Sequence, residues 1–203
     1  MKKFLALLLC LLMVCTSLVI VSCEEDEDKP SAETTRTETT TEETAKAETT
    51  TEETTEVTSV VPTGYQLYDD GELCFAYPKT WTKTVGSTVI LQNTSTGNNI
   101  TVVYEAKTDY YEKLTKSTFQ SELKPVLESL GMSISDETVT QVQNDNGMKI
   151  TEIVYLATAQ GRMLKQTMLI TTVGERTYSV TITEMQTDDT LNQNVFDSLA
   201  KSK

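Results

Sequence analysis

Histidine is absent from this chain of 203 residues. It is the usual general base near neutral pH, the commonest metal ligand, and the activating partner in ordinary Ser/His and Cys/His nucleophile pairs. Its absence therefore removes the most familiar forms of acid-base, metal-dependent and nucleophilic catalysis. We predict a protein that is not an enzyme, with no catalytic, metal-binding or cofactor-binding residues.

Positive charge is also scarce, because 30 acidic residues outnumber 17 basic residues and give a net charge of −13. Proteins that bind nucleic acid present a basic patch or stripe to the phosphate backbone. The sequence has no such stripe, so we predict no nucleic-acid partner. Acidic segments also repel anionic lipid head groups, so the folded part is not expected to contact a membrane through its own surface.

The first 22 residues have the pattern of a secretory signal peptide. Lys2 and Lys3 precede an apolar run from Phe4 to Val21 that contains no charged residue. A positive segment followed by an apolar segment is typical of the leader of an exported protein. The run of about 18 residues is close to the lower limit for a membrane-spanning helix, so an uncleaved anchor is the alternative on length alone.

The residues that end this run favour cleavage. Ile20-Val21-Ser22-Cys23 resembles the bacterial lipobox, in which an aliphatic, a variable and a small residue precede a cysteine that receives diacylglycerol. The resemblance covers only the leader. It implies a bacterial lipoprotein that begins at Cys23 after cleavage, held on the extracytoplasmic face of the cell membrane, because two acyl chains suffice for stable anchoring.

A segment rich in Thr and Glu follows, and we interpret residues 23–63 as a disordered stalk. ETTTEETAKA at 38–47 is followed by the near copy ETTTEETTEV at 48–57, and no recurring apolar residue gives the copies a face to bury. Residues 24–63 include 13 acidic and 3 basic residues, a net charge of −10 that should extend the segment. A full reach of roughly 130 Å would place a domain in a cell wall, which favours a Gram-positive cell.

We expect residues 64–203 to form one α+β domain, built on an antiparallel sheet of six or seven strands. In YSVTITE at 178–184, apolar residues alternate with Ser and Thr, which is the period of a half-buried strand. The other candidate strands are 72–78, 88–93, 99–106, 147–158 and 161–173. Asp70-Gly71 and Asn146-Gly147 are dipeptides that favour two-residue hairpin turns.

Two helices are expected to complete the domain. Apolar residues recur at helical spacing between Asp109 and Leu130, with Gly131 as the C-cap. Pro125 would either kink this long helix or open a second short one. A final helix is predicted from about Asp188 to Lys201, capped by Thr187 or Asp189. Its inner stripe is Leu191, Val195 and Leu199.

This order of elements, together with two short motifs, resembles the fold family of PsbP, a luminal photosystem subunit, and the bacterial lipoprotein DcrB. Tyr77-Pro78 ends an aromatic strand shortly before Trp81, and Phe196 and Leu199 lie near the end of the last helix. The resemblance covers about 65 to 200. It implies a PsbP-like fold and a role in binding or assisting macromolecules, but it transfers no binding residue. The YPKTW segment itself is interpreted as a strand end whose aromatic side chains fill the core, rather than as a ligand site.

The side chains that could take part in a reaction have structural interpretations instead. Cys74 is the only cysteine after Cys23, so it has no partner for an internal disulfide, and we expect a packed or partly covered thiol. Asp69-Asp70 is interpreted as a turn, because adjacent strand residues point to opposite faces. Asp188-Asp189 is interpreted as a helix start, where negative charge suits the helix dipole.

Binding motifs are equally weak. The segment 144–147, NDNG, lacks the residue spacing of an EF-hand calcium loop. Tyr110 and Tyr111 are expected to be exposed before the long helix, where they either contact a glycan or protein partner or cap the edge of the core. Three further residues form either a small basic patch or scattered surface charges: Arg162, Lys165 and Arg176.

These observations predict a lipid-anchored lipoprotein whose non-catalytic domain binds an envelope protein or a wall component. Two alternatives remain. A small envelope enzyme that uses carboxylates alone requires two acidic groups that converge in a pocket. A small-ligand receptor requires a deep apolar pocket.

Overall fold

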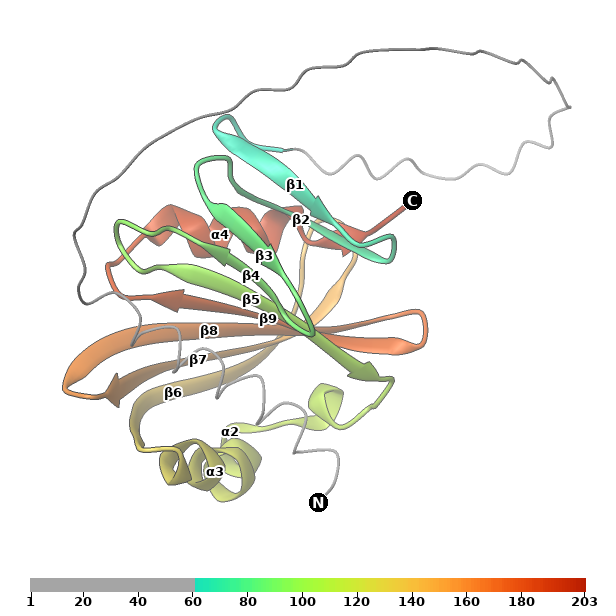
Figure 1. Ribbon diagram of the computed structural model, residues 1–203. Helices are drawn as coiled ribbons and strands as arrows, with labels where there is room; N and C mark the ends of the chain where they lie inside the picture. The colour runs from blue at the N-terminus through green and yellow to red at the C-terminus, as the bar shows by residue number, and fades with distance from the viewer. Residues whose placement is uncertain (1–60) are drawn as a thin grey trace, which may run out of the picture.

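The computed structural model describes residues 61–203 (Figure 1). The predicted leader, the lipidation site Cys23 and nearly all of the predicted stalk lie outside these residues. The described chain forms two antiparallel sheets with a few short helices, which confirms the predicted α+β class. Within this part of the chain, no helix combines the length and the apolar character that a bilayer-spanning helix needs.

The larger sheet has seven antiparallel strands in the order β3-β4-β5-β9-β8-β7-β6. In chain order the strands are β3 (Thr82–Val85), β4 (Val89–Gln92), β5 (Asn99–Ala106), β6 (Met132–Gln143), β7 (Lys149–Ala159), β8 (Arg162–Val173) and β9 (Arg176–Glu184). The prediction of one sheet with six or seven strands is only partly confirmed, because this sheet has seven strands but a second sheet is also present. Residues 72–78 do not join this sheet, and the two edge strands β3 and β6 belong to it instead.

A β-bulge explains why β6 is hard to recognise from the sequence. The register with β7 shifts between Ser135 and Thr138, and Asp136 has a φ of 53°. Met132 and Ile134 are buried before the bulge, and Glu137 is the next buried residue. The spacing of buried residues therefore changes from two to three, which breaks the alternation that marks a strand.

A second sheet of three strands has the order β1-β2-β10. Its strands are β1 (Tyr65–Asp69), β2 (Leu73–Pro78) and β10 (Ala200–Lys201). The expectation that residues 72–78 belong to the main sheet is wrong, because β1 and β10 occupy the two hydrogen-bonding edges of β2. β2 is buried from Leu73 to Tyr77, so it is the centre of a layer of its own.

The hairpin turns differ from the prediction in length. β1 and β2 are joined by residues 70–72, and β6 and β7 by residues 144–148, so the predicted two-residue turns at Asp70-Gly71 and Asn146-Gly147 are wrong. The two-residue turns are instead Gln160-Gly161 and Gly174-Glu175. Gln160 and Gly161 have φ values of 51° and 75°, which suits the right-handed twist of the flanking strands.

The predicted long helix is present over 116–129, as an uninterrupted helical run whose geometry changes along its length. Its parts are α2 (Lys116–Thr118), η2 (Phe119–Leu123) and α3 (Lys124–Ser129), and the short helix η1 (Tyr111–Lys113) precedes it. η2 is a π-helical turn that ends two residues before Pro125, which lacks the N–H group that a regular helix needs at this position. Gly131 follows the last segment with a φ of 84°, as expected of a helix-ending glycine.

The C-terminal helix α4 (Asp189–Ser198) is shorter than predicted. Its N-cap is Asp188, whose side chain accepts hydrogen bonds from the N–H groups of Thr190 and Leu191. The helix does not reach Lys201 because the backbone becomes extended at Leu199 and enters β10. The predicted inner stripe is confirmed, since Leu191, Val195 and Leu199 are fully buried.

Two hydrophobic clusters cover opposite faces of the larger sheet. The first lies between this sheet and the layer made of the smaller sheet and α4, and it includes Tyr77 and Trp81. The second lies between the sheet and the segments from η1 to α3. Figure 1 shows α4 and the smaller sheet on one side of the larger sheet and α2 and α3 on the other. The buried positions of Tyr77 and Trp81 agree with the prediction that their side chains fill the core.

Candidate functional site

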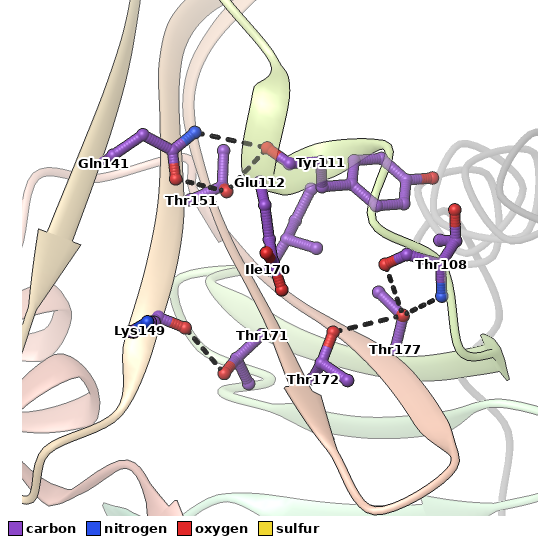
Figure 2. Close-up of a pocket in the computed structure, with 10 residues that line it drawn as sticks. All are labelled: Thr108, Tyr111, Glu112, Gln141, Lys149, Thr151, Ile170, Thr171, Thr172 and Thr177. Atoms are coloured by element: carbon purple, nitrogen blue, oxygen red, sulfur yellow. Dashed lines mark hydrogen bonds between the residues drawn. The ribbon is translucent and has the colours of Figure 1, made fainter.

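A small pocket lies where η1 meets strands β7, β8 and β9 (Figure 2). Its volume is about 20 Å³, which is room for about one water molecule. The lining residues are Thr108, Tyr111, Glu112, Gln141, Lys149, Thr151, Ile170, Thr171, Thr172 and Thr177. This is not the deep apolar pocket that a small-ligand receptor requires.

One half of the pocket wall holds η1 against the sheet. The main-chain oxygen of Tyr111 accepts hydrogen bonds from the Thr151 hydroxyl at 2.8 Å and from the Gln141 amide at 3.1 Å. The same Thr151 hydroxyl lies 2.9 Å from Gln141 Oε1. These side chains find their hydrogen-bond partners in one another and in the Tyr111 carbonyl of η1, which explains why polar residues can be buried here.

The other half of the wall joins the chain after β5 to β8 and β9. Thr177 Oγ1 accepts a hydrogen bond from the main-chain N–H of Thr108 at 3.0 Å and lies 3.3 Å from Thr172 Oγ1. Thr171 donates to the main-chain oxygen of Lys149 at 2.8 Å. Figure 2 shows these residues around one opening, with the Glu112 carboxylate directed toward its middle.

A second feature is an exposed patch, which we call the Tyr104 patch, made of Lys83, Val85, Tyr104 and Arg176. Tyr104 is 57% exposed and Val85 is 68% exposed, although both are large apolar residues on strands. The Arg176 guanidinium lies 4.3 Å from the centre of the Tyr104 ring, a cation–π contact. Lys83 makes a similar contact with the ring of Tyr68, at 5.0 Å.

Buried aromatic residues support the Tyr104 patch from below. The Tyr178 ring lies 5.5 Å from the Tyr104 ring, and the Arg176 guanidinium donates to the Tyr178 hydroxyl oxygen at 3.4 Å. This hydrogen bond raises the pKa of Arg176, while burial raises the pKa of Tyr178. Glu72 forms a salt bridge with Arg176 at 3.4 Å. Arg176 is thus held over the Tyr104 ring by Tyr178 and Glu72.

Two carboxylates approach Lys165 on the opposite face of the sheet from the pocket. Glu184 pairs with Lys165 at 3.3 Å, and its side chain is 1% exposed. Its oxygens also accept from the Asp188 main-chain N–H at 2.8 Å and from the Asn192 amide. Burial raises the pKa of Glu152, and Lys165 partly opposes this effect. Glu184 is therefore occupied in holding α4, and neither carboxylate lines the pocket.

The predicted structural interpretations of the acidic pairs are confirmed. Asp69 accepts a hydrogen bond from the Gly71 N–H at 2.8 Å, and this bond contributes most to lowering the pKa of Asp69. Asp70 accepts from the N–H groups of Glu72 and Leu73 at 3.0 and 2.8 Å. Both aspartates therefore shape the turn between β1 and β2.

Cys74 is buried on β2, as the sequence predicted. Burial is the main cause that raises the pKa of its thiol, and the negative charges of Asp69 and Asp70 act in the same direction. A thiol with a raised pKa is a poor nucleophile.

The three basic residues singled out in the sequence do not form a patch. Arg162 and Arg176 lie near opposite ends of β8, at its two hairpin turns. Lys165 and Arg176 are paired with different glutamates. Scattered charges are therefore the correct interpretation.

The expected exposure of Tyr110 and Tyr111 is wrong. Tyr111 is buried in the second hydrophobic cluster, and Tyr110 packs against the same cluster. The Tyr110 hydroxyl donates to Glu122 at 2.8 Å. The structure agrees with the alternative in which the two rings cap the edge of the core.

Comparisons with known proteins give little further information. No protein-family model matches the chain, and no curated protein matches it. A crystal structure at 1.50 Å resolution from Bacteroides thetaiotaomicron VPI-5482 is similar to 64% of this chain, with 10% sequence identity and a TM-score of 0.44. The match covers 45% of that protein, so this chain spans less than half of its length. We draw no conclusion from a likeness of this degree.

Proposed function

We propose that this protein is a bacterial lipoprotein that displays a non-catalytic binding domain on an acidic stalk. Cys23 carries the lipid that holds the chain on the extracytoplasmic face of a Gram-positive cell membrane. The domain acts as an accessory factor for an envelope protein or a wall component. No cofactor is needed for this function.

The exposed Tyr104 patch is the observation that carries the proposal. Tyrosine and arginine are enriched among the residues that contribute most to protein interfaces, because they combine large contact area with directional polar groups. Exposure of a single tyrosine is not by itself evidence of a binding surface. Tyr104 is 57% exposed, however, and its ring is held in place by contacts with Arg176 and Tyr178. Such pre-ordered side chains lose little conformational entropy when a partner binds.

The resemblance to the PsbP and DcrB family is part of the same proposal. It is supported by an antiparallel sheet with helices on both faces and by the positions of Tyr77, Trp81 and Leu199 in the core. An accessory role in that family agrees with a contact surface on the domain.

The test is affinity capture from crosslinked intact cells with three baits. The baits are the full protein, the stalk alone, and the full protein with Tyr104→Ala and Arg176→Gln. We expect a protein that is enriched by the first bait and lost with the other two. Equal enrichment by the first and third baits would exclude the Tyr104 patch as the contact surface. Equal enrichment by the stalk alone would exclude the domain as the part that binds the partner.

Lipidation is tested separately, with labelled palmitate and a Cys23→Ser variant. The proposal predicts that label enters the wild-type chain, that none enters the variant, and that the mature wild-type chain begins at residue 23. Label that persists in the variant would overturn this part.

A further inference from the structure

The strand β1 has one unpaired edge. It lies at the outer edge of the smaller sheet and pairs only with β2 within residues 61–203 (Figure 1). Successive residues of an antiparallel strand direct their N–H and C=O groups to alternate sides. The Lys79 N–H donates to Gly64 O at 3.0 Å, so Gly64 and every second residue after it face β2. Leu67 and Asp69 therefore direct their backbone groups to the outer edge.

The turn before β1 brings the chain to this outer edge. The Tyr65 N–H donates to Pro62 O at 3.0 Å. Gly64 has a φ of 85°, while Thr63 has no positive φ, which is the pattern of a type II turn. Because Tyr65 directs its backbone groups away from β2, Pro62 lies on the outer side of β1, and the chain direction is reversed across the turn.

The residues that lead into this turn have the composition of a strand. Residues 57–61, VTSVV, contain no charge, and four of the five are β-branched. The stalk before them is rich in Glu, and its last charged residue is Glu56. An unpaired strand edge is a template for another strand, and natural proteins usually cover or blunt such edges. Residues 57–61 combine a suitable composition with a turn that leads to the edge.

We propose that residues 57–61 pair with β1 as an added antiparallel strand, so that this chain itself covers the outer edge of the smaller sheet. The turn sets the register, because Pro62 lies opposite Tyr65 and places Val60 opposite Leu67. Val60 and Leu67 exchange two backbone hydrogen bonds, and their side chains lie on the same face of the sheet. Leu67, which is 43% exposed, gains an apolar cross-strand neighbour.

The added strand is short. A type II turn fits the twist of the flanking strands less well than a type I′ or II′ turn does. Pro62 also has no N–H group to donate to the Tyr65 carbonyl. Pairing therefore depends on the bonds between Val60 and Leu67 and on those further from the turn.

This pairing changes where the stalk leaves the domain. The added strand runs antiparallel to β1 and carries the chain toward Asp69, so the stalk ends at Glu56, beside the turn between β1 and β2. Coverage of the edge also prevents it from pairing with another protein molecule. The inference does not depend on the Tyr104 patch, which lies on other strands.

Amide exchange measured by NMR on the full chain in a non-ionic detergent tests the pairing. The Val60 and Leu67 amides are hydrogen-bonded in this register, whereas those of Ser59 and Val61 face solvent. We expect exchange at Val60 and Leu67 to be slowed roughly tenfold or more relative to Ser59 and Val61. Fast exchange at Leu67 would show that the edge is open and would overturn the proposal.

Contacts between α-protons test the register independently. Residues in non-hydrogen-bonded antiparallel pairs lie closest together, so we expect such contacts between Val61 and Gln66 and between Ser59 and Tyr68. A sample that mixes chains with different isotope labels shows whether these contacts lie within one chain. Contacts between two chains at this edge, or contacts in another register, would overturn the proposal.

Two proline variants provide a matched pair. Val60→Pro removes the N–H that bonds Leu67 O, so exchange at Leu67 should become as fast as at an unprotected amide. Ser59→Pro is the control, because the Ser59 N–H faces away from β1 and proline is tolerated at such edge positions. Protection of Leu67 should persist in this control. An equal effect of the two variants on Leu67 would contradict the proposed register.

Discussion

The side-chain amide nitrogen of Asn144 lies 2.7 Å from the main-chain oxygen of Leu199 and donates a hydrogen bond to it. The same nitrogen donates to Phe196 O at 2.8 Å, and Asn144 Oδ1 accepts from the Met148 N–H at 3.0 Å. The loop between β6 and β7 therefore caps the C-terminal end of α4. In this way NDNG, which resembles a calcium loop only superficially, has a structural role.

Asn144→Ala should lower the free energy of unfolding by about 3 kcal/mol, because it removes three hydrogen bonds in a largely buried position. Asn146→Ala is the matched control. Asn146 bonds Asp197 O and Leu199 O from a more exposed position, so we expect a loss of about 1 kcal/mol. Urea denaturation measures both, and equal losses would contradict the capping role of Asn144.

Glu184→Gln should destabilise the attachment of α4 to the sheet. The buried carboxylate accepts from the N–H of Asp188 at the start of the helix and pairs with Lys165. Loss of a charged acceptor costs about 1.5–3 kcal/mol, and the negative charge also suits the helix N-terminus. Glu175→Gln, in the exposed β8–β9 turn, should leave the urea midpoint unchanged. A midpoint for Glu184→Gln equal to that of the wild type would refute this assignment.

Glu137 should make the stability of the domain depend on pH. The hydrogen bond from Gln120 Nε2, at 2.6 Å, is the main cause that lowers the pKa of this carboxyl below its ordinary value of 4.5. A lowered pKa stabilises the fold above pH 4.5, and the stabilisation is lost as the pH falls through the folded-state pKa.

Glu137→Gln should therefore reduce stability at pH 7 by about 1.5–3 kcal/mol, and the difference from the wild type should shrink as the pH falls below 4.5. Urea unfolding across pH 3–7 gives the curve for each protein. A difference in unfolding free energy between the two proteins that stays constant across this range would show that the charge of Glu137 does not contribute to stability.

Cys74 should resist alkylation in the folded protein. Its thiol is buried and its pKa is raised, so the thiolate that reacts with iodoacetamide is rare at pH 8. Mass spectrometry of the Cys74 peptide should show little labelling in buffer and complete labelling in 6 M guanidinium. Rapid labelling in buffer would show that β2 opens readily.

The sequence predicted those strands whose alternation is regular and whose faces differ. β9 is an example, with its apolar residues on one face and Ser and Thr on the other. β6 could not be found in this way, because the bulge at Asp136 shifts the buried residues by one position. A disturbance of the long helix was foreseeable from Pro125, but its form, a π-helical turn within the helix, was not.

The second sheet and the pocket depend on contacts between distant parts of the chain. Leu73 and Cys74 pair with β10, at the far end of the chain, and no local pattern indicates this pairing. The threonines of the pocket between η1 and strands β7, β8 and β9 have the sequence pattern of ordinary strand residues. Only the three-dimensional path of the chain places Thr108 beside Thr177.

The most direct test of the proposed binding function maps the contact surface on the domain in intact cells. An amine-reactive crosslinker and mass spectrometry report which lysines join the partner. Lys83 lies in the Tyr104 patch, and Lys107 follows Ala106, the residue paired with Arg176. Lys113 and Lys116 lie on η1 and α2, away from this patch.

We expect crosslinks from Lys83 and Lys107 to one partner, and their loss in the Tyr104→Ala, Arg176→Gln protein. Crosslinks to that partner from Lys113 and Lys116 instead, or unchanged crosslinks in the variant, would contradict the proposed binding surface.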